Sequence, residues 1–370
     1  MRQHKNVYHN MEGRPGNQKR IVIGLLLLHL SIILIGQIGG KNNFEFLSLP
    51  ASARLTGLGG SLITIIDSDV NLAMASPALL NEKMNGSIAF NHNFNFDGIN
   101  NGHFAYGRKI EKWGINTHAA ISYANYGEFI AADENGVQTG TFKANELAFT
   151  LGASKVLNEK ITVGSNLKMA FSNLETYKAS ALLMDLGMVY STQEGRMNIA
   201  AVIQNLGSEL TTYNGTRYGL PLNIQIGLSN KLKHMPLRFS VIFHQLQQWS
   251  IRYDDPNNRD NVDLLGQQIE SSALSQSIDN FFRHTIFNGE FLLGKNEGFV
   301  LRAGYNHLRR KELQISQFRS LGGFSLGIGL KIKQFRIDYG VGYFHLAGGT
   351  NHLSIATKLN NFKSKTALIE

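Results

Sequence analysis

Residues 324–343, FSLGIGLKIKQFRIDYGVGY, contain two segments of alternating apolar and small or polar residues, joined by Lys333 and Gln334. Alternate residues of a β-strand point to opposite faces, so this stretch predicts a hairpin with one strongly apolar face. Each segment runs to about ten residues, which suffices for a tilted membrane crossing, whereas strands of soluble proteins average about five or six. The hairpin therefore favours a membrane-spanning sheet.

The same alternation recurs from Gly86 onward and gives about 14 strands in all. They are expected over residues 88–96, 104–106, 115–123, 147–153, 161–171, 182–190, 197–203, 222–228, 237–243, 287–293, 299–305, 324–332, 335–343 and 353–359. A soluble β-sandwich or propeller would also alternate, so the connections have to distinguish the classes.

The expected connections differ in length between the two ends of the sheet. Tight turns follow the even-numbered strands, at residues 111–112, 158–160, 193–195, 233–236, 295–298 and 333–334. Long loops follow odd-numbered strands, at residues 127–140, 207–219, 252–279 and 309–320. Short periplasmic turns and long outer loops are typical of outer-membrane barrels. The sequence therefore predicts an all-β fold, a 14-stranded antiparallel transmembrane β-barrel in the outer membrane of a Gram-negative bacterium.

The first 40 residues read as a secretory signal peptide. Five basic residues against one acidic residue give this stretch a net charge of +4, and residues 21–35 form an apolar run before Gly36. Met11 is an alternative start that we expect to be the true one. A retained membrane anchor is the competing interpretation, but the run is shorter than the roughly 20 residues of a spanning helix.

Composition excludes several classes of protein. The chain has no cysteine, so neither a disulfide scaffold nor a zinc–cysteine module is expected. Its formal charge of +9 falls to about +5 without the leader, which is too little for a nucleic-acid-binding surface, and no nucleic acid partner is expected. We divide the chain into a signal peptide (1–40), a plug segment (41–85), a barrel (86–360) and a C-terminal tail (361–370).

The plug segment carries a motif of small, charged and helix-capping residues. Asp67 or Asp69 is expected to cap a short helix over residues 70–74, which must end before Pro77 because the residue preceding proline avoids the α conformation. The backbone polar groups of these short turns cannot face lipid. The segment therefore belongs inside the barrel or in the periplasm. The motif residues are Ala53, Arg54, Gly57, Gly59, Gly60, Asp67, Asp69 and Pro77.

This motif resembles the N-terminal plug of the FadL-like outer-membrane barrels. The chain to about residue 360 is more narrowly similar to the PorQ family, PorV-like barrels of the type IX secretion system of Bacteroidota. Residues 44–47, 251–256, 304–307 and 309–313 carry that closer resemblance. The one departure is Ser76, where many relatives have Asn before the proline.

The resemblance implies a non-enzymatic role in protein secretion. PorQ-like barrels are expected to anchor a PorZ-like surface protein in a cell-surface attachment complex, together with PorV and a sortase-like protease. That complex processes secreted cargo and attaches it to anionic lipopolysaccharide. Outer-membrane lipid and lipopolysaccharide are therefore expected partners as well.

The longest expected loop, residues 252–279, is the candidate partner-binding segment. Tyr253, Leu264 and Leu265 would be its apolar anchors, with Asp254, Asp255 and Arg259 at the rim. The alternative to a partner-binding role is that a loop of this length is disordered. Arg309 and Arg310 on the next long loop could meet lipopolysaccharide, although a solvated face explains them equally well.

Catalytic chemistry has one formal candidate. Residues 323–327 fit the G-x-S-x-G pattern around Ser325, with Asp338 and then His345 or His352 following in the order of an α/β-hydrolase. That motif requires a strained strand-to-helix turn, whereas here it lies within an alternating strand, so an outer-membrane lipase is only a formal alternative. We expect no catalytic residues, no cofactor and no metal, and we interpret Asp67 and Asp69 as helix caps.

A FadL-like channel for hydrophobic compounds is the main competing function. A channel needs a continuous apolar pocket beside the plug, while a scaffold can have a filled and polar interior. Asn91, Asn93 and Asn95 on the non-lipid face of the first strand favour the polar interior.

Overall fold

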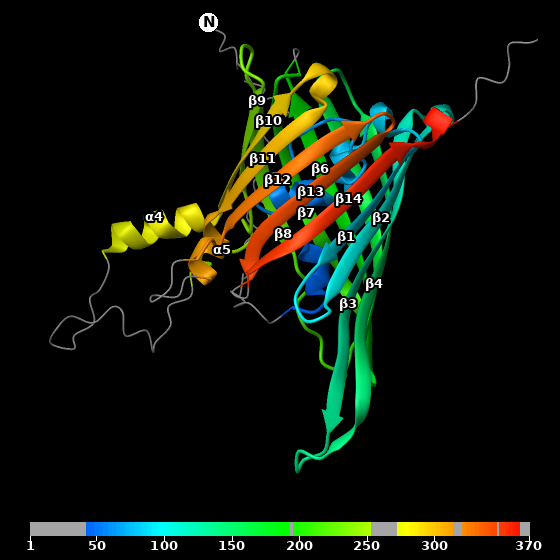
Figure 1. Ribbon diagram of the computed structural model, residues 1–370, viewed down its shortest axis with the longest axis vertical. Coiled ribbons are helices and arrows are strands. Elements are labelled where there is room, and N and C mark those ends of the chain that lie inside the picture. Colours follow the sequence, from blue (N-terminus) through cyan, green and yellow to red (C-terminus); the bar gives the residue numbers. More distant parts are fainter. Residues whose placement is uncertain (1–41, 193–194, 253–271, 314–319, 346–347, 363–370) are drawn as a thin grey trace, which may run out of the picture. The chain divides into compact units, whose positions relative to one another are not determined.

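A closed barrel of 14 antiparallel strands makes up the folded part of the chain (Figure 1). The computed structural model describes residues 42–192, 195–252, 272–313, 320–345 and 348–362. Each strand pairs with its neighbours in sequence, and β1 closes the ring by pairing with β14 from Ser87↔Lys358 to Phe94↔Asn351. The predicted fold class and strand number are confirmed. The predicted leader lies outside the described residues.

The strands fall close to the predicted segments, and most are longer. Their bounds are β1 Ser87–Phe94, β2 Asn100–Ile110, β3 Ile115–Ala132, β4 Gln138–Val156, β5 Ile161–Leu174, β6 Tyr177–Ser191, β7 Met197–Thr211, β8 Asn223–Lys231, β9 Leu237–Phe243, β10 Thr285–Leu293, β11 Phe299–Asn306, β12 Phe324–Ile332, β13 Phe335–His345 and β14 Gly348–Lys358.

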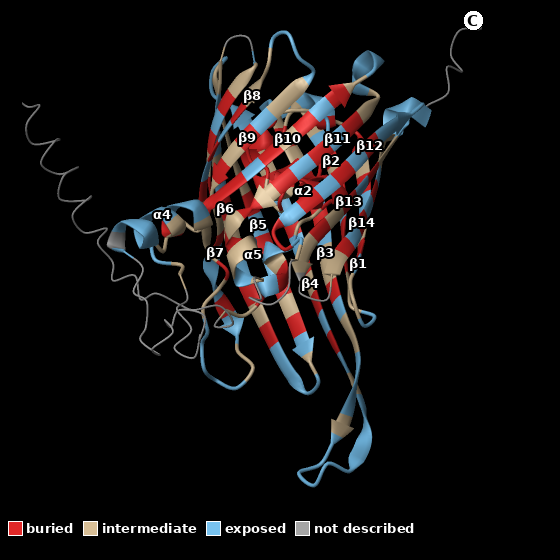
Figure 2. Ribbon diagram, turned by 60° about the vertical axis from the view of Figure 1, so that its left-hand side comes forward, coloured by how far each residue is buried: buried red, intermediate tan, exposed pale blue. Residues whose placement is uncertain are grey.

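Exposed and buried residues alternate along the wall (Figure 2). The exposed residues include many large apolar side chains. In β12, Phe324, Leu326 and Ile328 are exposed, while Ser325 and the intervening glycines are buried. In β1, Asn91 and Asn93 are buried toward the lumen, as predicted. This arrangement, apolar outside and small or polar inside, is that of outer-membrane barrels.

No helix in the described ranges is long and apolar enough to cross a membrane.

Two of the expected long loops contain more regular structure than the sequence suggested. Residues 127–140 were expected to form a loop, but β3 and β4 continue to the pair Ala132↔Gln138, and the rings of Phe129 and Phe142 stack 5.2 Å apart. Likewise β7 continues to Thr211, inside the expected loop 207–219. Aromatic and β-branched residues in these stretches extend the pairing beyond the membrane band.

Two helices occupy the other long connections at the same end of the barrel. The expected loop 252–279 ends in α4, Ala273–Arg283, and α5, His307–Glu312, precedes most of the expected loop 309–320. The tight turns described after β2, β4, β8, β10 and β12 lie at the opposite end, two of them forming the short helices η4, Glu111–Trp113, and η6, Lys295–Glu297. The predicted contrast between the two ends holds for three connections, β7–β8, β9–β10 and β11–β12, whereas β1–β2, β3–β4, β5–β6 and β13–β14 at the same end are short. A final turn, η7 Leu359–Phe362, follows β14.

The plug runs inside the barrel as a series of short helical turns. These are η1 Glu45–Ser48, α2 Ala53–Gly57, α3 Leu72–Ala75, η2 Pro77–Leu79 and η3 Glu82–Met84. The predicted helix at 70–74 corresponds to α3, which begins two residues and ends one residue later than predicted. It ends at Ser76, whose extended backbone is the conformation expected before proline, and Pro77 begins the next turn.

Glycines on the inner wall let the plug backbone touch the strands directly. A side-chain carbon at Gly340 of β13 would clash with the carbonyl oxygen of Ala53 in α2. One at Gly164 of β5 would lie 2.5 Å from the carbonyl carbon of Pro77. Several strand glycines therefore serve as contact points for the plug.

Replacing Gly340 with valine should displace α2 and destabilise the folded barrel by about 1–3 kcal/mol, the usual effect of overpacking. The matched control is Gly289→Val, because Gly289 also lies within a strand but a side-chain carbon there has no atom closer than 3.9 Å. Urea-induced unfolding of both variants in lipid vesicles measures the difference. Equal stabilities would contradict direct contact between plug and wall.

Candidate functional site

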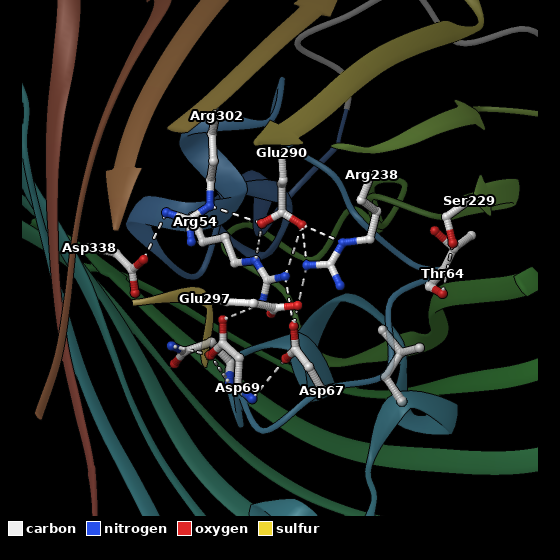
Figure 3. A network of polar contacts seen from close by, with 12 residues as sticks. Arg54, Thr64, Asp67, Asp69, Ser229, Arg238, Glu290, Glu297, Arg302 and Asp338 are labelled. Atoms are coloured by element: carbon white, nitrogen blue, oxygen red, sulfur yellow. Dashed lines mark hydrogen bonds and ion pairs between the residues drawn. The ribbon is translucent and has the colours of Figure 1, made fainter. Parts of the chain in front are cut away.

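Arg54 of α2 lies at the centre of a network of charged groups inside the barrel (Figure 3). Its helix begins at Ser52, whose hydroxyl accepts a hydrogen bond from the backbone N–H of Leu55 at 3.3 Å. The wall fixes the same helix start, because the N–H of Ala53 donates to Ser354 Oγ of β14 at 2.8 Å. These contacts direct Arg54 into the lumen, where it is 1% exposed.

The Arg54 guanidinium joins the plug to the wall. Its Nε and Nη2 donate to the two carboxylate oxygens of Glu290 in β10 at 2.9 and 3.1 Å. Within the plug, Nη2 lies 2.8 Å from Asp67 Oδ2 and Nη1 lies 3.2 Å from Asp69 Oδ2. Two-point pairing of this kind holds an arginine in one orientation and is stronger than a neutral hydrogen bond.

Three further arginines extend the network along the wall. Arg238 Nε of β9 donates to Glu290 Oε2 at 2.9 Å, and Arg302 Nε of β11 donates to Glu290 Oε1 at 3.0 Å. Arg302 Nη1 also lies 2.7 Å from Asp338 Oδ1 of β13, as an ion pair rather than an aligned hydrogen bond. Arg336 Nε donates to the other oxygen of Asp338 at 2.9 Å.

The charges of this network balance. Four guanidinium groups, on Arg54, Arg238, Arg302 and Arg336, face four carboxylates, on Asp67, Asp69, Glu290 and Asp338. We call these eight residues the ionic cluster. Burial acts to raise the pKa of Asp67, but attraction to Arg54, Arg238 and Arg336 and the hydrogen bond from Arg54 together outweigh it and hold the pKa well below its ordinary value. Asp67 is therefore ionised at neutral pH.

The two plug aspartates have a second role in shaping the backbone. Asp67 Oδ1 accepts from the N–H of Asp69 at 3.0 Å, and Asp69 Oδ1 accepts from the N–H of Asn71 at 3.2 Å. The N-cap position of α3 is Asn71, which makes no side-chain cap, so neither aspartate caps the helix in the predicted way. They hold the turn before it, with their remaining oxygens turned to Arg54.

A second buried pair lies on the opposite wall. Lys168 Nζ of β5 lies 2.8 Å from Asp185 Oδ2 of β6 and donates to Asn205 Oδ1 of β7 at 2.9 Å. Asn205 stands at an irregularity in β7 and has a positive φ of 60°. Asn166 donates from one amide group to Asp185 and to the carbonyl of Ala73, both at 3.0 Å, so this pair also holds α3.

The long-loop end of the lumen is filled differently. Phe44 and Phe46 of the plug pack against alanines of β3 to β6, together with Tyr213 and Leu220. The N–H of Asn43 donates to the carbonyl of Gly219 at 2.8 Å, and Tyr213 OH donates to Ser172 Oγ of β5 at 2.6 Å. Residues 212–220 therefore turn inward and meet the start of the plug.

A cavity of about 100 Å³ lies beside the plug. Phe46, Leu49 and Pro50 contribute apolar lining, whereas His103, Tyr123 and Gln225 contribute polar lining from the wall. Pockets that hold drug-sized ligands measure about 300–1,000 Å³. The cavity has room for a few water molecules or a very small compound.

The structure brings together three of the predicted plug-motif residues, Arg54, Asp67 and Asp69. Of the others, Ala53 and Gly57 contact the wall, Gly59 and Gly60 form a turn with φ of 81° and 98°, and Pro77 begins η2. Sequence reasoning missed the wall residues of the ionic cluster. A charged residue on the inward parity of a predicted strand, such as Glu290 or Arg302, was the signal that could have found them.

Of the predicted partner loop, residues 252–279, the structure describes only residue 252 and residues 272–279. Tyr253, Asp254, Asp255, Arg259, Leu264 and Leu265 lie outside the described residues. Arg309 and Arg310 lie in α5 rather than in an irregular loop. Arg309 Nη1 pairs with Glu312 at 3.2 Å, and Arg310 donates to the carbonyl of Ser320.

The catalytic-looking residues have structural partners. Ser325 lies within β12, and its Oγ accepts from the N–H of Gly59 at 2.8 Å. Asp338 belongs to the ionic cluster, and His352 Nδ1 lies 2.9 Å from Thr56 Oγ1. Ser325 and His352 bind the plug, whereas Asp338 pairs with two arginines of the wall, so the three hold separate contacts rather than a triad. Within the described ranges, no group of three or more side chains could hold a metal ion.

Comparison with known proteins gives likeness at the level of fold. No family model matches the sequence, and no curated protein matches it. The toluene transporter TodX of Pseudomonas putida superposes with a TM-score of 0.48 at 11% identity, over 83% of this chain and 96% of that one. A FadL homologue of Pseudomonas aeruginosa gives 0.46 at 10% identity, over 83% and 98%. The CymD monoaromatic hydrocarbon channel gives 0.47 at 12% identity, over 84% and 96%. Identities this low concern the fold, not what the chain binds.

Replacing Arg54 with alanine should remove one cationic partner from each of three carboxylates, Asp67, Asp69 and Glu290, and destabilise the folded protein by about 3–5 kcal/mol. Lys109→Ala is the control, because Lys109 makes similar contacts to Glu82 and Glu111 at 2.8 and 3.0 Å, but with side chains that are 74% exposed. Exposed pairs contribute less than about 1 kcal/mol. Urea unfolding followed by tryptophan fluorescence compares the two. A loss no larger for Arg54→Ala would show that the cluster does not hold the plug.

Proposed function

We propose that this protein is a plugged, non-enzymatic barrel of the outer membrane that anchors a partner at the cell surface. The observation that carries the proposal is the attachment of the plug. Polar groups of α2 and α3 bind the wall through the ionic cluster and through Asn166, while Phe44 and Phe46 fill the lumen near the long-loop end. A plug held by this many buried contacts suits a static support better than a moving gate.

Strand geometry supports an anchoring role at the surface. β3 and β4 extend together as a long hairpin at the long-loop end, where α4 and α5 also lie (Figure 1). These elements give the barrel a structured outer rim rather than a set of short loops. Such a rim offers a partner a fixed surface, because each element leads directly into a strand of the closed wall.

The finer proposal follows from the PorQ-like stretches. Residues 304–307 and 309–313 lie at the end of β11 and in α5, on the outer rim. In this proposal the rim holds a PorZ-like protein of the type IX attachment complex, near PorV and the sortase-like protease. The cargo attached there would be linked to lipopolysaccharide. The host would then be a member of the Bacteroidota.

A channel for hydrophobic compounds is the second candidate. The cavity beside the plug favours it, since Phe46, Leu49 and Pro50 offer apolar contact at a point where the plug meets the wall. Two similar barrels, TodX and CymD, bear the names of toluene or hydrocarbon channels, and this candidate assigns a comparable substrate class here. Transport through this chain would require rupture of contacts in the ionic cluster or displacement of Phe44 and Phe46.

Affinity purification of the tagged barrel from detergent-solubilised outer membranes of the native host tests the anchoring proposal. The intact barrel should retain a PorZ-like protein identified by mass spectrometry, and replacement of residues 255–271 by a short Gly/Ser linker should release it. The matched control places the same linker at residues 133–137, the tip of the β3–β4 hairpin. Absence of the PorZ-like protein from the intact sample would refute the finer proposal.

Uptake of radiolabelled toluene by cells that produce the barrel tests the second candidate. A static plug predicts the same uptake as in cells with the empty vector. Uptake above that level, raised further by Arg54→Ala, would establish a gated channel and overturn the static support.

A further inference from the structure

We propose that α4 lies in the lipid interface of the outer leaflet, with its apolar side immersed in the membrane. This inference concerns a surface outside the lumen and holds for an anchor and for a channel alike. It assigns the exposed side of α4 to lipid, rather than to water or to a protein partner.

The apolar side of α4 is continuous and exposed. Leu274, Ile278, Phe281 and Phe282 are 71%, 50%, 43% and 40% exposed on a helix of 11 residues. Their spacing of four, three and one residues places them on one arc of about 100°. Four large apolar side chains on one helix would be a costly surface in water.

Two polar residues in the C-terminal half of the same helix face the protein. Asn280 donates to the carbonyl of Trp249 and accepts from the N–H of Ile251 at 3.2 Å, and it is 8% exposed. Asp279 lies 3.3 Å from His307 Nε2 and 3.4 Å from Lys311 Nζ of α5. A helix of a water-soluble protein is packed the other way round, with its apolar side inward. The observed orientation matches that of the barrel wall, which turns its apolar side chains outward.

The apolar side of α4 continues the lipid-facing surface of the barrel. The ring of Phe281 lies 5.6 Å from that of Phe243 in β9. Phe243 pairs with Thr285, two residues before the outward-facing Phe287, so its side chain lies on the same outer face of the sheet. Only His284 separates the last helical residue, Arg283, from β10. Both views show α4 extending away from the wall rather than over the mouth of the barrel (Figures 1 and 2).

Aromatic residues and charge place this helix at the level of the headgroups. Trp249 is 64% exposed and stacks on His284 with ring centres 5.3 Å apart, directly beside the base of α4. Amphipathic aromatic rings gather at this boundary of outer-membrane barrels. Together α4 and α5 contain Arg283, Arg309, Arg310 and Lys311 against Asp279 and Glu312, a positive surplus of two that complements an anionic lipid surface.

Spin labels on single cysteines test the position of α4, because the chain has no cysteine of its own. Labels at Leu274→Cys and Ile278→Cys on the apolar side are compared with one at Gln276→Cys on the polar side. Leu326→Cys, on the lipid face of β12, and Asn135→Cys, at the tip of the β3–β4 hairpin, are the references for lipid and water. Each labelled barrel is first shown to be folded by its heat-modifiable migration in a gel.

Oxygen, which concentrates in lipid, and a water-soluble nickel chelate report the surroundings of each label in vesicles of phosphatidylcholine with added phosphatidylglycerol. Labels at 274 and 278 should behave like the one at 326, with nickel accessibility several-fold lower than at 276. Values like those at position 135 would place the helix in water. Exclusion of both reagents would mean that protein covers it, and either result would overturn the proposal.

Discussion

The closed wall requires that the lumen be filled by groups whose polar atoms find hydrogen-bond or ionic partners. A barrel of 14 strands is too wide for its own side chains to meet at the centre. The plug supplies the missing volume, but it brings backbone groups and charged side chains into a buried space. The ionic cluster answers this requirement by matching each guanidinium with a carboxylate.

Membrane and lumen make opposite demands on the same strands. Outward positions carry Phe, Leu and Ile, whereas inward positions carry glycine where the plug backbone touches the wall and charge where Arg54 has to be held. The paired ends of β3 and β4 extend beyond the rest of the wall, and α4 turns its large apolar side chains outward as the wall does. The lumen therefore holds the contacts between plug and wall, while the proposed partner surface lies on the rim.

Local pattern explains what the sequence could predict. Alternation and turn spacing are properties of consecutive residues, so the number and order of strands and the turn before Pro77 follow directly from them. The ionic cluster joins Arg54 to residues more than 180 positions away, such as Glu290, and no local pattern encodes that pairing. Local pattern does not reveal that strand pairing continues beyond Gly127 or that residues Ala273–Arg283 form a helix. Both stretches are rich in polar residues, a composition that is also typical of loops.

Contacts between α2 and β14 couple the plug to the seam of the barrel. The N–H of Ala53 binds Ser354, and Thr56 binds His352, both on the strand that closes against β1. A slip of one residue at that seam would turn Ser354 and His352 toward lipid and leave the plug without these partners. During assembly, these contacts therefore favour the correct pairing of β1 with β14 over a shifted one. The plug, which precedes the first strand, thus helps to set the register in which the barrel closes.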